Sequence, residues 1–242
     1  MRASVLTQPV LSQQLLLSVA EELKVPLLQI ARQAELAGLQ ANGAVSLQQI
    51  QTTADMALRL IDSYVLGARL ALEDQYLFEM EPVSVSSVLY DAGQQLEAMA
   101  KLYGVELELN VSGKYGPVMA HRSGLQAALV SLGHALIEAM PAIGDAKHRP
   151  RLSLSAYRSR YGIVTGVYSE VEQLTTEALR QGKKINGQAR QPLATLTHTA
   201  GAGIFVADTI LQAMNSELTV SRHHKLYGLA AILKPNPQLQ LI

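Results

Sequence analysis

The chain of 242 residues contains no cysteine, and this absence excludes several kinds of chemistry. Disulfide bonds, thiol nucleophiles and zinc sites built on cysteine are all ruled out. A protein without cysteine is compatible with a reducing compartment, so we expect a cytoplasmic location. Any catalytic or binding site must therefore be built from other residue types.

Long apolar runs are also missing. No stretch approaches the roughly 20 apolar residues that span a bilayer as a helix, and the N-terminus lacks the basic-then-apolar pattern of a signal peptide. We expect no direct insertion into a membrane. Either a partner delivers any membrane signal, or the chain is a soluble fragment of a longer protein.

The chain has no excess charge of either sign. Its 20 Lys and Arg residues balance 20 Asp and Glu residues, and the isoelectric point is about 7. Domains that bind nucleic acid usually carry a concentrated basic surface. Nucleic acid is therefore not an expected partner.

Residues 1–75 have the apolar period of a helical hairpin. Apolar residues recur in alternating steps of four and three, which places them along one side of a helix, and Asn42-Gly43 separates the two stretches as a turn. The first stretch contains Leu16, Ala20, Leu23, Leu27, Ile30 and Ala34, and the second contains Leu47, Ile50, Ala54, Ala57, Ile61, Tyr64, Ala68 and Ala71. A sustained period near 3.5 residues predicts coiled-coil-like packing.

Two helices bury too little surface to be stable alone, so the hairpin needs a partner. A second copy of the chain would complete an antiparallel four-helix bundle, and we therefore predict a homodimer. The alternative is a hairpin that packs on the C-terminal domain of its own chain, because intramolecular bundles show the same period.

Residues 76–242 mix two periods. Alternating apolar and polar residues predict strands, whereas longer stretches between them predict helices. The expected strands are 105–111, 151–156, 162–167, 217–220 and 228–233, and the expected helices are 87–103, 122–140 and 204–214. Strands and helices interleave without regular alternation, which predicts a mixed sheet covered on one face by helices. The whole chain is then α+β, with a hairpin followed by an α/β sandwich.

Several stretches resemble motifs of the sensor histidine kinases, in the order in which that family has them. Residues 20–27 read AEELKVPL and are similar to the phosphoacceptor box. Residues 81–85 resemble the entry to the ATPase domain, and 125–137 resemble the N box. Gly201-Ala-Gly203 looks like the glycine-rich end of the ATP lid, and 228–235 resemble the terminal strand. The resemblance implies a dimerisation hairpin over 1–75 and a histidine-kinase-like ATPase domain over 76–242.

The phosphoacceptor box departs from the family at its central residue. Where the family has the histidine that receives the phosphoryl group, this chain has Glu21, while Glu22 and Pro26 match the family. A carboxylate would form at best a labile acyl phosphate. Glu21 is then either an ordinary solvated charge on a helix or a fixed negative charge that imperfectly mimics a phosphorylated residue.

The positions that hold the magnesium nucleotide in the family are also substituted. Ser131 and Ala135 stand where the N box has asparagines that help to hold Mg²⁺, and alanine offers no oxygen ligand. Ser169 stands where the family has an aspartate that binds the adenine amino group, so the charge that strengthens this hydrogen bond is lost. The resemblance therefore implies no metal site. The neighbouring His134 points elsewhere round the helix and is expected to be a surface or packing residue.

Only the last glycine motif is partly retained. Gly201 and Gly203 precede an expected helix, and backbone donors at a helix start can bind phosphate without any side chain. Because the motif is so short, a plain helix start is the preferred interpretation. We expect no resident cofactor, with ATP or Mg²⁺ bound only weakly.

Three functions follow from the resemblance. The first is a pseudokinase that acts as a dimeric scaffold or regulator towards a response-regulator-like or kinase partner. The second is a working ATP-dependent histidine kinase with divergent motifs. The third is a phosphotransfer protein with a degenerate ATPase domain, but such proteins keep the histidine of the bundle, and no histidine lies in residues 1–120. We expect the first, a protein that is not an enzyme.

Overall fold

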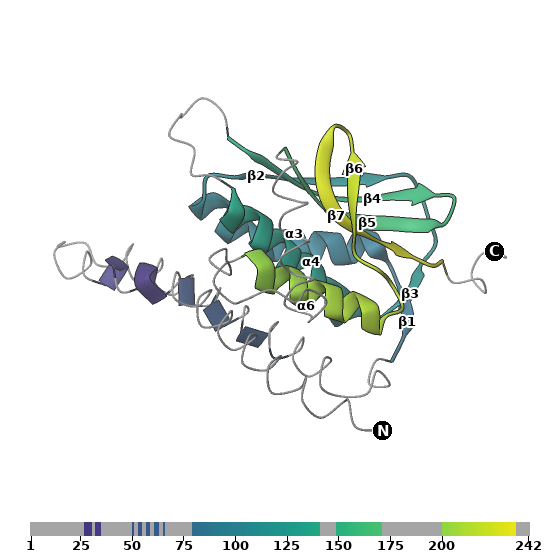
Figure 1. Ribbon diagram of the computed structural model, residues 1–242, viewed down its shortest axis with the longest axis horizontal. Coiled ribbons are helices and arrows are strands. Elements are labelled where there is room, and N and C mark those ends of the chain that lie inside the picture. The colour runs from purple at the N-terminus through teal and green to yellow at the C-terminus, as the bar shows by residue number, and fades with distance from the viewer. Residues whose placement is uncertain are drawn as a thin grey trace, which may run out of the picture.

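The structure is a computed structural model in which the described residues are 27–30, 32–34, 50, 53–54, 57–58, 61–62, 65, 79–140, 149–170 and 200–235. In residues 79–235 of this set, helices lie against one side of a mixed β-sheet (Figure 1). The helices are α3 (Val85–Leu102), α4 (Arg122–Ala139) and α6 (Ala200–Ala213). The strands are β1 (Glu81–Val83), β2 (Glu106–Ser112), β3 (Val118–Ala120), β4 (Arg151–Ser159), β5 (Gly162–Ser169), β6 (Thr219–His223) and β7 (Leu226–Leu233).

The larger sheet has five strands in the order β2-β4-β5-β7-β6. The β2–β4 pair is parallel, whereas the other three pairs are antiparallel, so the predicted mixed sheet is confirmed. The short strands β1 and β3 form a separate antiparallel pair. The sequence did not predict these two, because three residues are too few to show a period.

Residues next to the helix ends explain why α4 begins and α3 ends where they do. His121 caps α4, because its Nδ1 atom accepts a hydrogen bond from the backbone N–H of Gly124 at 3.0 Å and satisfies one of the free donors of the first turn. Gly104 follows the end of α3 with φ of +67°, a backbone conformation that glycine adopts without a steric penalty. The two helices therefore begin and end close to the predicted residues.

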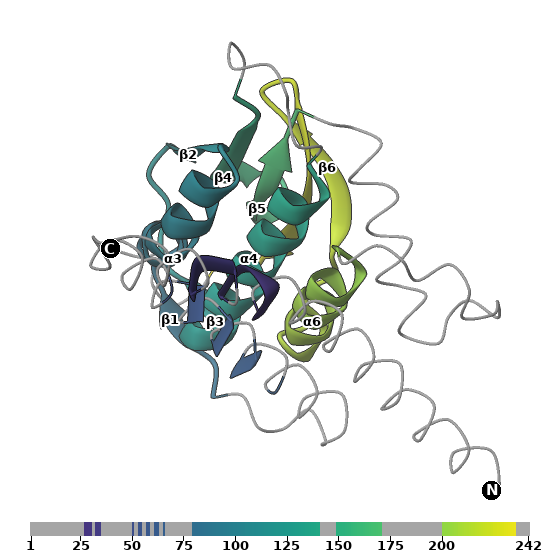
Figure 2. The ribbon, with the colours of Figure 1, turned by 90° about the vertical axis from the view of Figure 1, so that its left-hand side faces the viewer.

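The main core lies between the helices and the sheet. Alternate residues of β4, namely Leu152, Leu154 and Ala156, join this core, as the period of two predicted. Helix α4 lies between α3 and α6 (Figure 2) and contacts both helices and the sheet. This central place explains why α4 is buried on nearly every side from Ala128 to Ile137.

The opposite face of the sheet is partly closed by curvature. Strands β5 and β7 separate β4 from β6, so a flat sheet would hold β4 and β6 about 14 Å apart. Yet the Tyr157 ring of β4 stacks on the His223 ring of β6 at 4.2 Å, and the Tyr157 hydroxyl lies 3.3 Å from the Ser221 hydroxyl. The β6–β7 hairpin therefore curls over the sheet and buries a second small cluster around Tyr168 and Val164.

Parts of the predicted hairpin are helical in the described residues. The Thr53 hydroxyl donates a hydrogen bond to the Gln33 side chain at 3.3 Å, so the two expected helices touch. No described helix is long and apolar enough to span a bilayer. The homodimer and the division at residue 75 stay predictions.

Candidate functional site

Three of the predicted nucleotide-site residues, Ser131, Ala135 and Gly203, meet where α6 packs on α4. A Cβ atom added to Gly203 would lie 2.7 Å from the backbone oxygen of Ser131 and 3.2 Å from the Cβ atom of Ala135. Real Cβ atoms essentially never approach another atom to 2.7 Å, so glycine at position 203 lets the two helices approach this closely. The sequence assigned these residues to separate family motifs, and in the structure they lie close together; whether they bind a nucleotide stays a prediction.

The two α4 positions face protein rather than solvent. Ser131 and Ala135 are each 2 % exposed. The Ser131 hydroxyl has no hydrogen-bond partner in the described part of the chain, which costs about 1–3 kcal/mol for a buried hydroxyl. In this arrangement, neither residue presents an oxygen to a ligand outside the α4–α6 contact.

Ser169 is the last residue of β5, and it lies on the face of the sheet that the helices cover. It is fully buried, and its hydroxyl lacks a partner among the described residues, as does the hydroxyl of Thr165 on the same side of the strand. Ser169 is in register with Leu152 on one side and Tyr227 on the other. A hydroxyl in this position can accept one hydrogen bond from an amino group, but it has no charge to strengthen that bond.

His134 is a packing residue, one of the two roles that the sequence left open. It is 4 % exposed, and its Nδ1 atom has no partner among the residues that the structure describes. Burial lowers the pKa of His134 to about 4 because the imidazolium ion would lose its hydration. His134 is therefore neutral at physiological pH.

The glycine motif differs from the prediction in one respect. Helix α6 begins at Ala200, so Gly201 and Gly203 lie inside its first turn and do not precede it. Gly203 is accommodated in the helix by close packing on α4, a tertiary contact that overrides its low helix propensity. Free backbone donors in the first turn remain available in principle for an anion.

The remaining predicted residues are not tested. Glu21, Glu22 and Pro26 lie outside the described residues. Within the described residues, no group of three or more His, Asp or Glu side chains is placed to hold a metal ion. The absence of a metal or cofactor in the whole protein stays a prediction.

Comparison with solved structures identifies the fold. The histidine kinase AdeS of Acinetobacter baumannii is 14 % identical and has a TM-score of 0.52, with 89 % of this chain and 98 % of that chain covered. Full-length ShkA in complex with AMPPNP is 15 % identical with a TM-score of 0.53, over 93 % of this chain and 46 % of that chain. A bacterial phosphotransferase is 11 % identical with a TM-score of 0.50, over 96 % and 98 % of the two chains.

No protein-family model matches the chain, and no curated protein matches its sequence. At the identities found, the structural likeness shows the fold alone. The described α+β domain has a histidine-kinase-like fold, as the order of the motifs predicted, whereas the N-terminal hairpin stays a prediction.

Proposed function

We propose that this protein is a pseudokinase of two-component-type signalling, which acts as a dimeric scaffold or regulator and does not transfer phosphate from ATP. Its partner would be a response-regulator-like protein or a kinase. One observation carries the proposal: the residues at the family's metal-binding positions, Ser131 and Ala135, are closed against Gly203 of α6.

This contact argues against kinase activity because of what phosphoryl transfer requires. Catalysis of such transfers depends almost entirely on positioning and on metal charge around the phosphates. Ala135 has no oxygen for Mg²⁺, and its Cβ atom is in contact range of a neighbouring helix rather than a nucleotide cleft. Ser169, at the adenine-reading position, is fully buried and uncharged.

The described residues of the predicted hairpin include exposed apolar side chains that a partner could cover. Leu27 is 58 % exposed and Leu28 is 60 % exposed, although both are large apolar residues on a helix. In contrast, two apolar residues of the second predicted helix are covered: Ala57 is buried and Ile61 is half-buried. A second copy of the chain would cover the exposed leucines of the first helix in the predicted four-helix bundle.

A phosphotransfer protein is the second candidate. The likeness to a bacterial phosphotransferase covers 96 % of this chain and 98 % of that chain, so it extends into the residues of the predicted hairpin. Against this candidate, the first 120 residues contain no histidine to carry the phosphoryl group. A working kinase is the third candidate and would need other residues to hold the metal.

Calorimetric titration with ATP, with and without Mg²⁺, tests the proposal. We expect a dissociation constant near 1 mM or weaker, which corresponds to about −4 kcal/mol, and no effect of Mg²⁺. Micromolar binding that depends on Mg²⁺ would favour the working kinase. Transfer of labelled phosphate from a phosphorylated response regulator to this chain would favour the phosphotransfer protein.

A further inference from the structure

A basic pocket lies at the opposite end of β5 from Ser169. Three segments that are far apart in the sequence form it: the loop after β2 (Lys114–Gly116), the β4–β5 turn with its flanks (Arg158–Ile163), and Pro235 after β7. The cavity has a volume of about 590 Å³. Because Ile163 and Ser169 are six residues apart on one strand, the pocket is roughly 20 Å from the position of Ser169.

The lining of the pocket is positively charged and contains no acidic residue. Lys114, Arg158 and Arg160 all belong to it, and none of them forms a salt bridge within the described part of the chain. Other arginines are paired: Arg122 lies 2.7 Å from Asp91, and Arg151 lies 2.6 Å from Glu170. In a chain with zero net charge, three unpaired cations around one cavity are a local excess that attracts anions.

The rim of the pocket is held in place by hydrogen bonds. The Ser159 hydroxyl donates to the backbone oxygen of Gly162 at 3.0 Å and accepts from the backbone N–H of Tyr161 at 3.2 Å. Gly162 has φ of +148°, and a Cβ atom there would lie 2.4 Å from the backbone oxygen of Leu233. The turn that carries Arg160 is therefore preorganised, which reduces the cost of binding.

The opposite rim is also attached to the sheet. Pro235 forms an antiparallel bridge with Val118, the first residue of β3. The backbone N–H of Met119 donates to the backbone oxygen of Lys234 at 3.4 Å. The loop with Lys114 and Tyr115 is thus joined to the end of β7.

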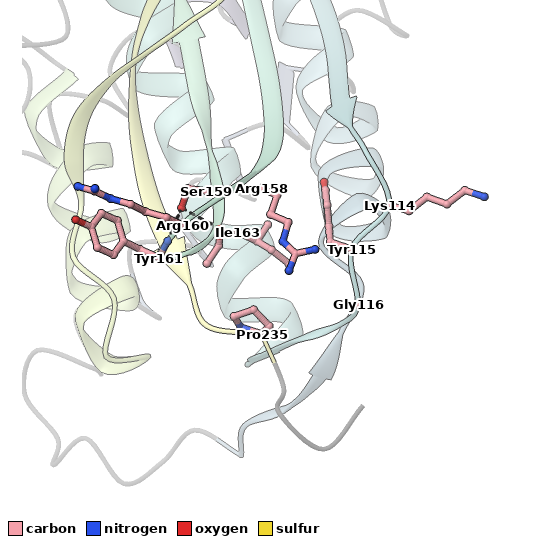
Figure 3. A pocket seen from close by; sticks show the side chains of 10 residues that line it. Lys114, Tyr115, Gly116, Arg158, Ser159, Arg160, Tyr161, Ile163 and Pro235 are labelled. Atoms are coloured by element: carbon pink, nitrogen blue, oxygen red, sulfur yellow. Dashed lines mark hydrogen bonds between the residues drawn. The ribbon is translucent and has the colours of Figure 1, made fainter. Parts of the chain in front are cut away.

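Figure 3 shows how the side chains lie around the cavity. Arg158 extends towards Tyr115 across the middle of the pocket, whereas Arg160 and Tyr161 lie together on one flank. The Arg160 guanidinium is 4.5 Å from the centre of the Tyr161 ring. Lys114 points outwards on the other flank, and its four-carbon stem lets the ammonium group turn towards a bound anion.

We propose that this pocket binds a small phosphorylated molecule with at least two negative charges, such as a diphosphate or a nucleoside diphosphate. A guanidinium group matches two oxygens of a phosphate at once, and each phosphate monoester group carries about 1.5 to 2 charges at neutral pH. The cavity volume falls in the range of about 300–1,000 Å³ typical of small-molecule sites. This site is separate from the degenerate nucleotide positions and does not depend on the proposed function.

The test is calorimetric titration of the full chain with pyrophosphate and with adenosine diphosphate, without Mg²⁺ and at low salt. We expect saturable binding of pyrophosphate that weakens as salt is added. Arg158→Gln should weaken it at least tenfold, and Arg158→Gln with Arg160→Gln should abolish it. Tighter binding of adenosine diphosphate than of pyrophosphate would identify a nucleotide as the ligand type, and equal binding would identify the diphosphate group alone.

Two control variants make the test specific. Arg222→Gln on β6 removes one positive charge outside the pocket. Ser169→Ala changes the residue at the family's adenine-binding position. Both variants should bind pyrophosphate like the wild type. Thermal melts should show that the exposed arginine variants remain folded. The proposal is overturned if neither ligand binds at millimolar concentration, if binding survives the double substitution, or if Arg222→Gln weakens it equally. Binding of an acidic peptide in place of pyrophosphate would also overturn it.

Discussion

Gly203 on α6 and Ala135 on α4 pack so closely that a Cβ atom added to Gly203 would lie 3.2 Å from that of Ala135. By their resemblance to histidine-kinase motifs, both positions were expected to contribute to a nucleotide site. In this chain they hold two helices together. The contact has consequences that mutagenesis can measure.

Gly203→Ala should destabilise the protein. The added methyl group would meet the backbone oxygen of Ser131 at 2.7 Å, and overpacking of this kind costs about 1–3 kcal/mol. Gly93→Ala is a matched control in α3, because nothing lies within 4 Å of its added methyl group, and it should stabilise by up to about 1 kcal/mol. Urea unfolding measures both changes. Equal effects of the two substitutions would show that α6 does not pack on α4 as described.

Restoring the family residues should not restore autophosphorylation. Glu21→His should take no label from γ-labelled ATP, because the γ-phosphate must also be positioned and its charge neutralised. Adding Ala135→Asn and Ser169→Asp should not help. The first would push an amide into the α4–α6 contact, and the second would bury a carboxylate at a fully buried position. Acid-labile, alkali-stable phosphate on either variant would mean that the ATP site still works.

The stability of the protein should decrease in mild acid because of His134. Its pKa is about 4 in the folded protein and 6.5 in an unfolded chain, so the unfolded state binds the proton first as the pH falls below 6.5. The contribution of neutral His134 to the free energy of unfolding is fully present above pH 6.5. It is lost as the pH falls towards 4, by roughly 3 kcal/mol in total.

The measurement is the free energy of unfolding between pH 7.5 and 4.5 for the wild type and for His134→Leu. Carboxylate titration contributes to both proteins, so the difference between their pH profiles reports His134. The wild type should lose more stability with acid than the variant. Parallel profiles would show that His134 gains a proton without a penalty.

Light scattering should give about twice the 26.1 kDa mass of one chain. Leu28→Lys should reduce this to the monomer mass without unfolding the protein, because Leu28 is 60 % exposed within one chain. Leu109→Lys is the control, since Leu109 is an exposed leucine on β2, outside the predicted bundle. A wild-type monomer at micromolar concentration would contradict the predicted dimer.

Much of the ATPase-like domain could be predicted from local patterns. The alternation in β4 and the period of α4 depend on neighbouring residues alone, so their positions followed directly from the sequence. The same holds for the family motifs, since Ser131, Ala135 and Ser169 were identified by their place in order along the chain. The sequence could not show that Ser131 and Ala135 meet Gly203, because residues some 70 apart come together only through packing.

The sequence by itself determined which chemistry is missing: no thiol, no histidine before residue 121, and no metal-binding oxygen at Ala135. These are properties of side chains and hold in any fold. The tertiary structure decided what stands elsewhere in the fold, namely a close helix contact at Gly203 and a cluster of cations around Arg158 that has no ion-pair partner among the described residues. Contacts and electrostatic fields depend on distance in space, and only the folded chain sets the distances between Lys114, Arg158 and Pro235.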